Sequence, residues 1–143
     1  MTGNAELLNY IYQNSQMGVE TLDKLLHITK DKEFKSLIRS QYSEYKTIHD
    51  TAKRIADKHG FAEKGLGMFE KLRTGMMINM QTMADKSASH ISEMLMVGSN
   101  MGIINAVKSL KKYQNAEPEI RDLMEDLLRL EENNIQELKR YLS

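Results

Sequence analysis

The sequence contains no cysteine and no tryptophan, and it has a single proline among its 143 residues. Without cysteine, disulfides, thiolate metal sites and thiol catalysis are all excluded, and a reducing compartment is the expected location. The scarcity of aromatic residues argues against a sheet protein, because strands are rich in aromatic and β-branched side chains. What the chain has instead is leucine, glutamate, lysine and eleven methionines, a composition typical of helices.

An excess of charge of one sign is also missing, because 20 Lys and Arg residues balance 20 Asp and Glu residues. Nucleic acid is therefore not an expected partner, since binding to phosphates needs a basic surface. No stretch approaches the roughly 18 apolar residues of a membrane span, and the opening MTGNAELLNY lacks the pattern of a secretion signal. We expect a cytoplasmic protein without membrane contact, folded as one domain over residues 1–143.

The spacing of the apolar residues predicts five helices. They cover about residues 4–29, 32–59, 68–85, 89–112 and 116–142. Asp31 is placed to cap the second helix, and Gly60 is placed to end it. Pro118 falls in the first turn of the last helix, where its missing N–H costs nothing.

Short turns predict that the first two helices and the last two form antiparallel hairpins, and the third helix could carry the chain back along the bundle. This arrangement resembles the ferritin-like fold, an all-α four-helix bundle of two antiparallel hairpins joined by a long crossover. Here an additional helix would lie in the crossover, between the second and third bundle helices. The resemblance covers nearly the whole chain and lies in lengths and connections. The alternative is an up-and-down bundle or a dimeric coiled coil in which the third helix continues into the fourth.

The resemblance implies where a metal centre would have to lie. Bacterial ferritin-like metalloproteins build a di-metal site in the middle of the bundle, from glutamates and Glu-x-x-His pairs on facing helices. Residues equally far from a hairpin turn lie at the same depth along the helices. The middle layer predicted in this way consists of Met17, Gly18, Glu44, residues 99–101 and Glu131.

Two glutamates of this layer are the main candidate ligands. A helical wheel places Glu44 and Gln41 on the buried face of the second helix, and Glu131 and Asn134 on that of the last. The histidine of the Glu-x-x-His pattern is missing from both helices, so redox di-iron chemistry is not expected. The four oxygen-bearing side chains could hold a divalent cation such as Mg²⁺, Ca²⁺ or Mn²⁺. The alternative is a buried polar network that sets the register of the helices.

Four further residues are secondary candidates for the same chemistry. His90 and Glu93, in the stretch SASHISEMLM, have the spacing of a metal-binding pair, but they lie roughly 12 to 16 Å from the middle layer. They also suit the first turn of a helix capped by Ser89. Tyr45 lies beside Glu44, and His49 is expected at the edge of the buried face.

The methionines gather in the run MMINMQTM of the third helix. They could be flexible core filler, an adaptable protein-binding surface or a thioether site for Cu(I). Ile103, Val107 and Leu110 make the fourth helix apolar on the side away from its core stripe. We expect a homo-oligomer that forms through the fourth helix or the Met-rich third helix.

Catalytic signatures are missing from the sequence, which shows no nucleophile, base and orienter set and no Gly-rich phosphate loop. The expected function is a non-catalytic binding or structural module without an intact di-iron centre. The alternative is a divergent metal-binding protein, for storage or metal-dependent chemistry, that uses Glu44 and Glu131. A carrier with an apolar pocket beside the Met-rich helix is a third hypothesis.

Overall fold

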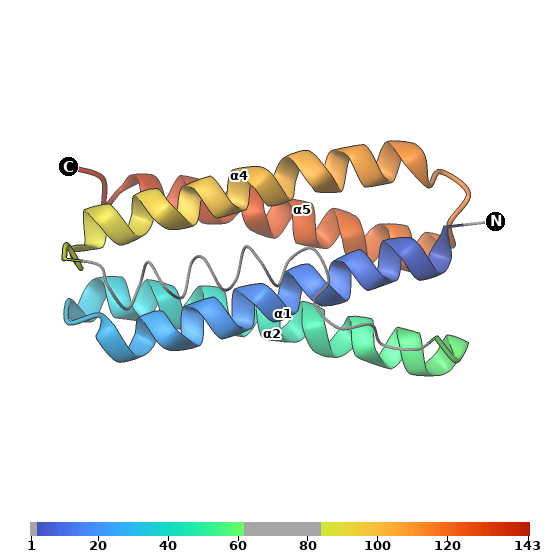
Figure 1. The fold of residues 1–143 in the computed structure, drawn as a ribbon, viewed down its shortest axis with the longest axis horizontal. Coiled ribbons are helices and arrows are strands. Elements are labelled where there is room, and N and C mark those ends of the chain that lie inside the picture. Colours follow the sequence, from blue (N-terminus) through green and yellow to red (C-terminus); the bar gives the residue numbers. More distant parts are fainter. Residues whose placement is uncertain (1–2, 62–83) are drawn as a thin grey trace.

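The computed structural model describes residues 3–61 and 84–143, which form four helices (Figure 1). The helices are α1 (Asn4–Ile28), α2 (Lys32–His59), α4 (Ala88–Lys112) and α5 (Pro118–Lys139). Their bounds agree with the predicted ones to within three residues, and no strand occurs among these residues. The predicted helix 68–85 lies almost entirely outside the described residues.

The ends of α2 follow from the cap residues that the sequence supplies. The Asp31 carboxylate accepts a hydrogen bond of 2.8 Å from the Phe34 N–H, which satisfies one of the free donors of the first turn. Gly60 ends the helix in the left-handed region, with φ of 70°, where a residue without a Cβ has no steric penalty. Both cap predictions are confirmed.

The starts of α4 and α5 differ in detail from the prediction. Ser87 rather than Ser89 caps α4, and its hydroxyl accepts the His90 N–H at 3.2 Å. The residue before α5 is Glu117, and its N–H donates to the Asn4 side chain of α1 at 2.7 Å. A side chain of another helix therefore accepts a hydrogen bond from a free N–H group at the start of α5. A pattern of neighbouring residues cannot predict such a contact.

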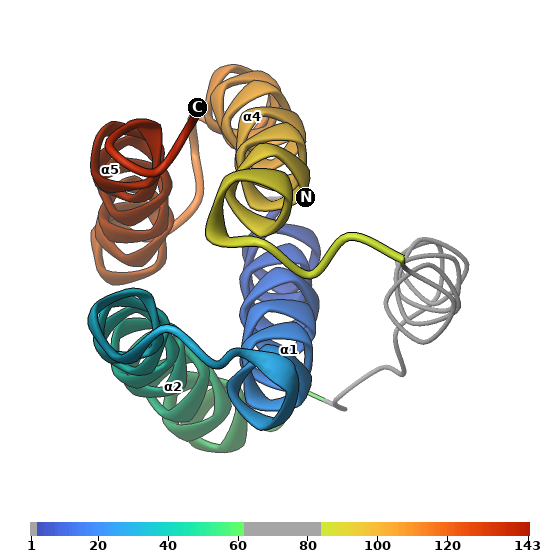
Figure 2. The ribbon, with the colours of Figure 1, turned by 90° about the vertical axis from the view of Figure 1, so that its left-hand side faces the viewer.

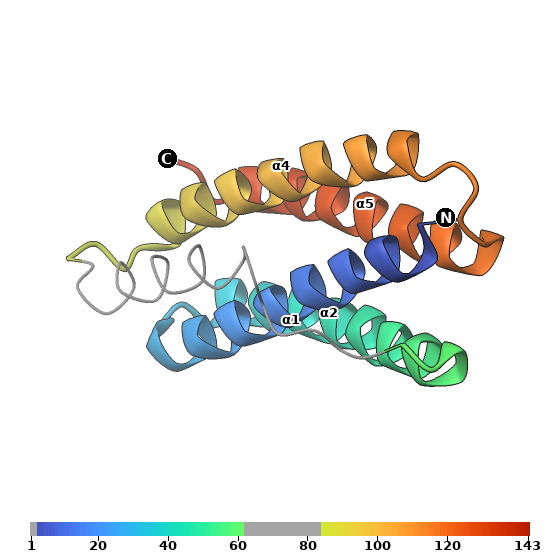
Figure 3. The ribbon, with the colours of Figure 1, turned by 45° about the vertical axis from the view of Figure 1, so that its right-hand side comes forward.

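The helices form two antiparallel pairs, α1 with α2 and α4 with α5, which lie side by side as two layers (Figures 2 and 3). α2 ends at the end of the bundle opposite to the one where α4 begins, so these two helices run in the same direction (Figure 1). The C-terminal end of α2 and the beginning of α5 meet at one end of the bundle.

A single hydrophobic core runs between the two layers. Its fully buried large side chains are Leu7, Leu8, Ile11, Leu22, Leu25, Phe34, Ile38, Ile55, Ile91, Ile120, Met124 and Leu127. They recur at helical spacing on all four helices, so each helix buries one face. None of the described helices has a window that is long and apolar enough to cross a membrane.

The outward apolar side of α4 is not the predicted one. Ile103, Val107 and Leu110 are half-buried. The exposed apolar side chains of this helix are instead Val97, Met101 and Ile104, with exposed fractions of 65%, 45% and 54%.

Candidate functional site in the middle of the bundle

Glu131 of α5 is the centre of the middle layer. Only 2% of its surface is exposed, because the four-three spacing that places Leu127 and Leu138 in the core places Glu131 there as well. The Asn14 amide of α1 donates a hydrogen bond of 2.8 Å to one carboxyl oxygen, and the Tyr45 hydroxyl of α2 donates a longer one of 3.4 Å to the other. Each oxygen of this buried carboxyl therefore has a neutral polar partner.

Two glycines make room for this arrangement. A Cβ on Gly102 of α4 would lie 2.4 Å from both carboxyl oxygens of Glu131. A Cβ on Gly18 of α1 would lie 2.7 Å from the Tyr45 ring. The layer thus draws on all four helices, and at two positions only a residue without a side chain fits the space.

Burial raises the pKa of Glu131 from its ordinary 4.5 to about 8, and the hydrogen bonds from Asn14 and Tyr45 offset only part of that effect. At neutral pH the carboxyl is therefore mostly protonated and neutral. Burial also raises the pKa of Tyr45, and any charge on Glu131 raises it further, so the phenol keeps its proton. The Tyr10 hydroxyl donates to the Gly102 carbonyl at 3.3 Å, and burial raises its pKa in the same way.

A cavity of about 50 Å³ lies beside Glu131 and is partly open to solvent. Its wall includes Thr21, Gln41 and Ser99, three polar side chains that are at least nine-tenths buried. The Thr21 hydroxyl and the Gln41 amide nitrogen have no hydrogen-bond partner among the residues that the structure describes. The cavity has room for a few water molecules or one small polar solute, which would satisfy these groups.

Asn134 occupies the position where the Glu-x-x-His pattern would place a histidine. Asn134 is 1% exposed. Its side chain lies close enough to the Tyr45 hydroxyl to lower the pKa of that phenol, which offsets part of the increase caused by burial. Neither polar atom of its amide makes a hydrogen bond of normal geometry with any residue of 3–61 or 84–143. The predicted burial of Glu131, Gln41 and Asn134 is therefore confirmed.

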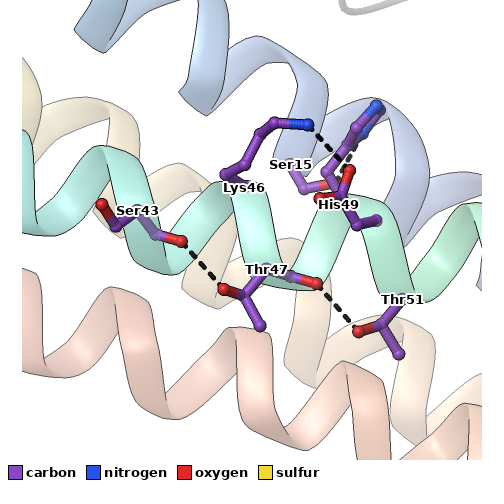
Figure 4. Close-up of polar contacts among 7 residues, drawn as sticks. Ser15, Ser43, Lys46, Thr47, His49 and Thr51 are labelled. Carbon is purple, nitrogen blue, oxygen red and sulfur yellow. Dashed lines mark hydrogen bonds and ion pairs between the residues drawn. The ribbon is translucent and has the colours of Figure 1, made fainter.

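The prediction that Glu44 is buried in this layer is wrong. Glu44 is exposed, and partial desolvation together with the charge of Glu137 raises its pKa. The buried face of α2 is turned by one position relative to the predicted wheel, so that Tyr45 enters the layer instead. Thr47, three residues after Glu44, is exposed as well, and its hydroxyl donates to the Ser43 carbonyl at 3.0 Å (Figure 4).

Of the four secondary candidates, Tyr45 belongs to this cluster, and the other three lie outside it. His90 is half-buried in the first turn of α4, and Glu93 is exposed. His49 packs against Tyr12 across the first hairpin with ring centroids 4.5 Å apart, the contact that equal depth along α1 and α2 predicts. One of its ring nitrogens lies 3.3 Å from the Ser15 hydroxyl (Figure 4).

Two features were missed in the sequence. Gly102 faces Glu131 directly. The small-residue strip Gly98, Gly102 and Ala106 predicts that another helix approaches the fourth helix closely, but it does not indicate Glu131 as the neighbour. His59, Glu117 and Glu119 form a polar cluster at one end of the bundle. The predicted hairpins already bring the end of the second helix and the start of the last to the same end, so the topology could have indicated it.

No protein-family model matches the chain, and comparisons with curated proteins and with solved structures find no match.

Proposed function

We propose that the protein is a non-catalytic ferritin-like bundle whose centre is a neutral polar layer rather than a di-iron site. The observation that carries this proposal is the environment of Glu131, a buried carboxyl whose partners are the neutral Asn14 and Tyr45. A di-iron centre needs several carboxylates that converge on one point. Glu44, the second carboxylate that the resemblance would supply, is exposed.

The direction of the helices supports the ferritin-like part of the proposal. α2 ends and α4 begins at opposite ends of the bundle (Figure 1), as expected where a long crossover joins two antiparallel hairpins. An up-and-down bundle would join them at the same end. The crossover helix that the sequence predicts over 68–85 is part of this proposal.

The layer would act in the protein by fixing the register of the two hairpins. If the α4–α5 pair slid along the α1–α2 pair by one turn, Glu131 would leave Asn14 and Tyr45 and lie among apolar side chains. An unpaired carboxyl in such surroundings is costly. A buried polar residue specifies one helix register in this way at some cost in stability.

A cation site at Glu131 is the second candidate, and an unsatisfied acceptor, the amide oxygen of Asn134, favours it. The Asn134 amide oxygen is buried and has no hydrogen-bond partner within residues 3–61 and 84–143, and the buried Gln41 amide lines the cavity beside Glu131. A small hard cation with Glu131 and the amide oxygens as ligands would displace the carboxyl proton. With a single buried carboxylate in the layer, the binding would be weak.

The metal content of protein purified without chelators distinguishes the two functions. We expect the metal contents of the native chain and of Glu131→Gln to agree within about a tenth of an equivalent, before and after incubation with Fe²⁺ or Mn²⁺, because the neutral carboxyl attracts cations poorly. The protein should also not accelerate Fe²⁺ oxidation by air. About one equivalent of metal in the native chain, lost in Glu131→Gln but kept in Glu132→Gln, would contradict the proposal and establish the cation site.

The expected homo-oligomer belongs to the same proposal. Val97, Met101 and Ile104 lie one turn apart on α4 and are exposed, so a second copy packed on them would bury apolar surface. Light scattering at high protein concentration tests this contact, and a strictly monomeric mass would contradict it.

A further inference from the structure

Three side chains with metal-ligating atoms meet where α2 ends and α5 begins. They are His59, the last residue of α2, Glu117, which precedes α5, and Glu119 in its first turn. One ligand atom from each lies within 4.8 Å of the other two. The cluster is at the end of the bundle and shares no residue with the layer around Glu131.

The local structure holds the imidazole in place. The Phe61 N–H donates to the Ala56 carbonyl at 2.9 Å, which closes the end of α2 and folds Phe61 back on the helix. The rings of His59 and Phe61 then stack with centroids 5.2 Å apart and an angle of 11°. The His59 side chain is only 19% exposed, and its Nε2 atom is fully buried.

The carboxylates are positioned by the first turn of α5. The Glu117 backbone is held by the hydrogen bond from its N–H to Asn4. One of its carboxylate oxygens lies 3.3 Å from the His59 Nε2. This contact lacks the geometry of a hydrogen bond. The buried nitrogen therefore has a charged group beside it but no hydrogen-bond partner in the described part of the chain.

We propose that His59, Glu117 and Glu119 bind a divalent transition-metal ion of the zinc type, with water as the fourth ligand. Zn²⁺ lies about 2.0 to 2.1 Å from imidazole nitrogen and carboxylate oxygen, so neighbouring ligands of a tetrahedral site are about 3.3 Å apart. The His59 and Glu117 atoms already have this separation. A Glu119 oxygen lies within 4.8 Å of a ligand atom of each of these two residues, and a closer approach of this side chain would complete the set.

The ligand types select the class of ion. Imidazole nitrogen is a good ligand for zinc and the later transition metals, whereas Mg²⁺ and Ca²⁺ prefer oxygen ligands throughout. Two carboxylates also balance the two charges of the ion. Structural zinc sites have four protein ligands. A site with three protein ligands and one water molecule, as proposed here, is instead accessible to other molecules.

Lys58 is the competitor for this site. Its ammonium group lies 3.3 Å from a carboxylate oxygen of Glu119 and so supplies a positive charge there in the absence of metal. The Lys58 side chain is 61% exposed, so it can turn into solvent at small cost when the ion binds. Removal of this lysine should strengthen metal binding, whereas a cluster that consists only of ion pairs gains nothing from its loss.

The test is a titration of the full, untagged chain with ZnCl₂ in competition with a chromogenic chelator of known affinity. We expect one equivalent to bind, with at least a tenfold loss of affinity in His59→Ala and in Glu119→Gln, and a several-fold gain in Lys58→Ala. Co²⁺ should bind at the same place and show the absorption of a four-coordinate ion.

The matched control is His27→Ala, which removes a histidine from the last turn of another helix. His27 is exposed, and a ring nitrogen of it contacts the Asp23 carbonyl at 2.7 Å. This variant should bind zinc like the native chain, and circular dichroism verifies that all four variants are folded. Failure of the native chain to bind at about 100 μM zinc, or equal affinity in His59→Ala and His27→Ala, would overturn the proposal.

Discussion

Replacement of Glu131 by glutamine is expected to remove most of the pH dependence of the free energy of unfolding between about pH 5 and pH 8. The folded chain holds the Glu131 proton up to a pKa of about 8, whereas an unfolded glutamate loses it near its ordinary value of 4.5. Unfolding therefore releases a proton in this range. The stabilisation by the neutral carboxyl is complete below about pH 4.5 and is lost as the pH rises to about 8.

The expected slope for this one group is a loss of about 1.4 kcal/mol of stability per pH unit in the middle of the range. Glutamine has the shape of the protonated carboxyl and no proton to lose. Glu131→Gln should therefore match the native chain near pH 5 and exceed its stability near pH 8. Urea unfolding at several pH values measures the difference between the two proteins, in which the contributions of all other groups cancel.

Glu132→Gln is the matched control, because Glu132 is the next residue of α5 and is exposed. Its pH profile should run parallel to that of the native chain. If Glu131→Gln also gives a parallel profile, Glu131 is charged in the folded protein, and the neutral polar layer is refuted.

Gly102→Ala is expected to destabilise the protein by about 2 kcal/mol, with a range of about 1 to 3, because the layer has no space for a Cβ. The added methyl would lie 2.4 Å from both carboxyl oxygens of Glu131. A surface glutamate would swing away, but this one is enclosed and hydrogen-bonded to Asn14. The substitution therefore has to break that bond or push α4 away from α5.

The same substitution in a Glu131→Ala background distinguishes this clash from a general effect on the helix. Without the carboxyl there is space for the methyl group, and alanine is intrinsically better than glycine in a helix by about 1 kcal/mol. Gly102→Ala should then be neutral or stabilising. If it stabilises the native chain as well, Glu131 is not held against Gly102. Thermal or urea unfolding of the native chain, the two single variants and the double variant measures the free energies that this comparison needs.

The helices could be predicted from the sequence because local chemistry determines their ends. Asp31, Gly60 and Pro118 act at the positions where their side chains or backbone freedom suit a helix end. The depth of each residue along the bundle was also predictable, because residues of a hairpin that are equally far from its turn lie side by side. Met17, Gly18, Ser99 and Glu131 do line one cavity.

The partners of Glu131 were not predictable to the same degree. On α2, Leu37 and Ile38 are both apolar, so periodicity alone leaves the buried face uncertain by one position. Packing against the other helices resolves this uncertainty in favour of Ile38 and Tyr45, and Glu44 turns outward. Hydrogen bonds between residues more than a hundred positions apart, such as that from Asn14 to Glu131, depend on such rotations and on rotamers.

The central claim is that the bundle is built around one neutral carboxyl, and the titration of that carboxyl tests it most directly. Carbon-13 NMR of protein labelled in the glutamate side chains follows each carboxyl, and comparison with Glu131→Gln assigns the resonance of Glu131. We predict that this resonance titrates with a pKa of about 8. A pKa at or below the ordinary 4.5 would contradict the claim, because it would mean that a positive charge or a bound cation stabilises the carboxylate in the folded protein.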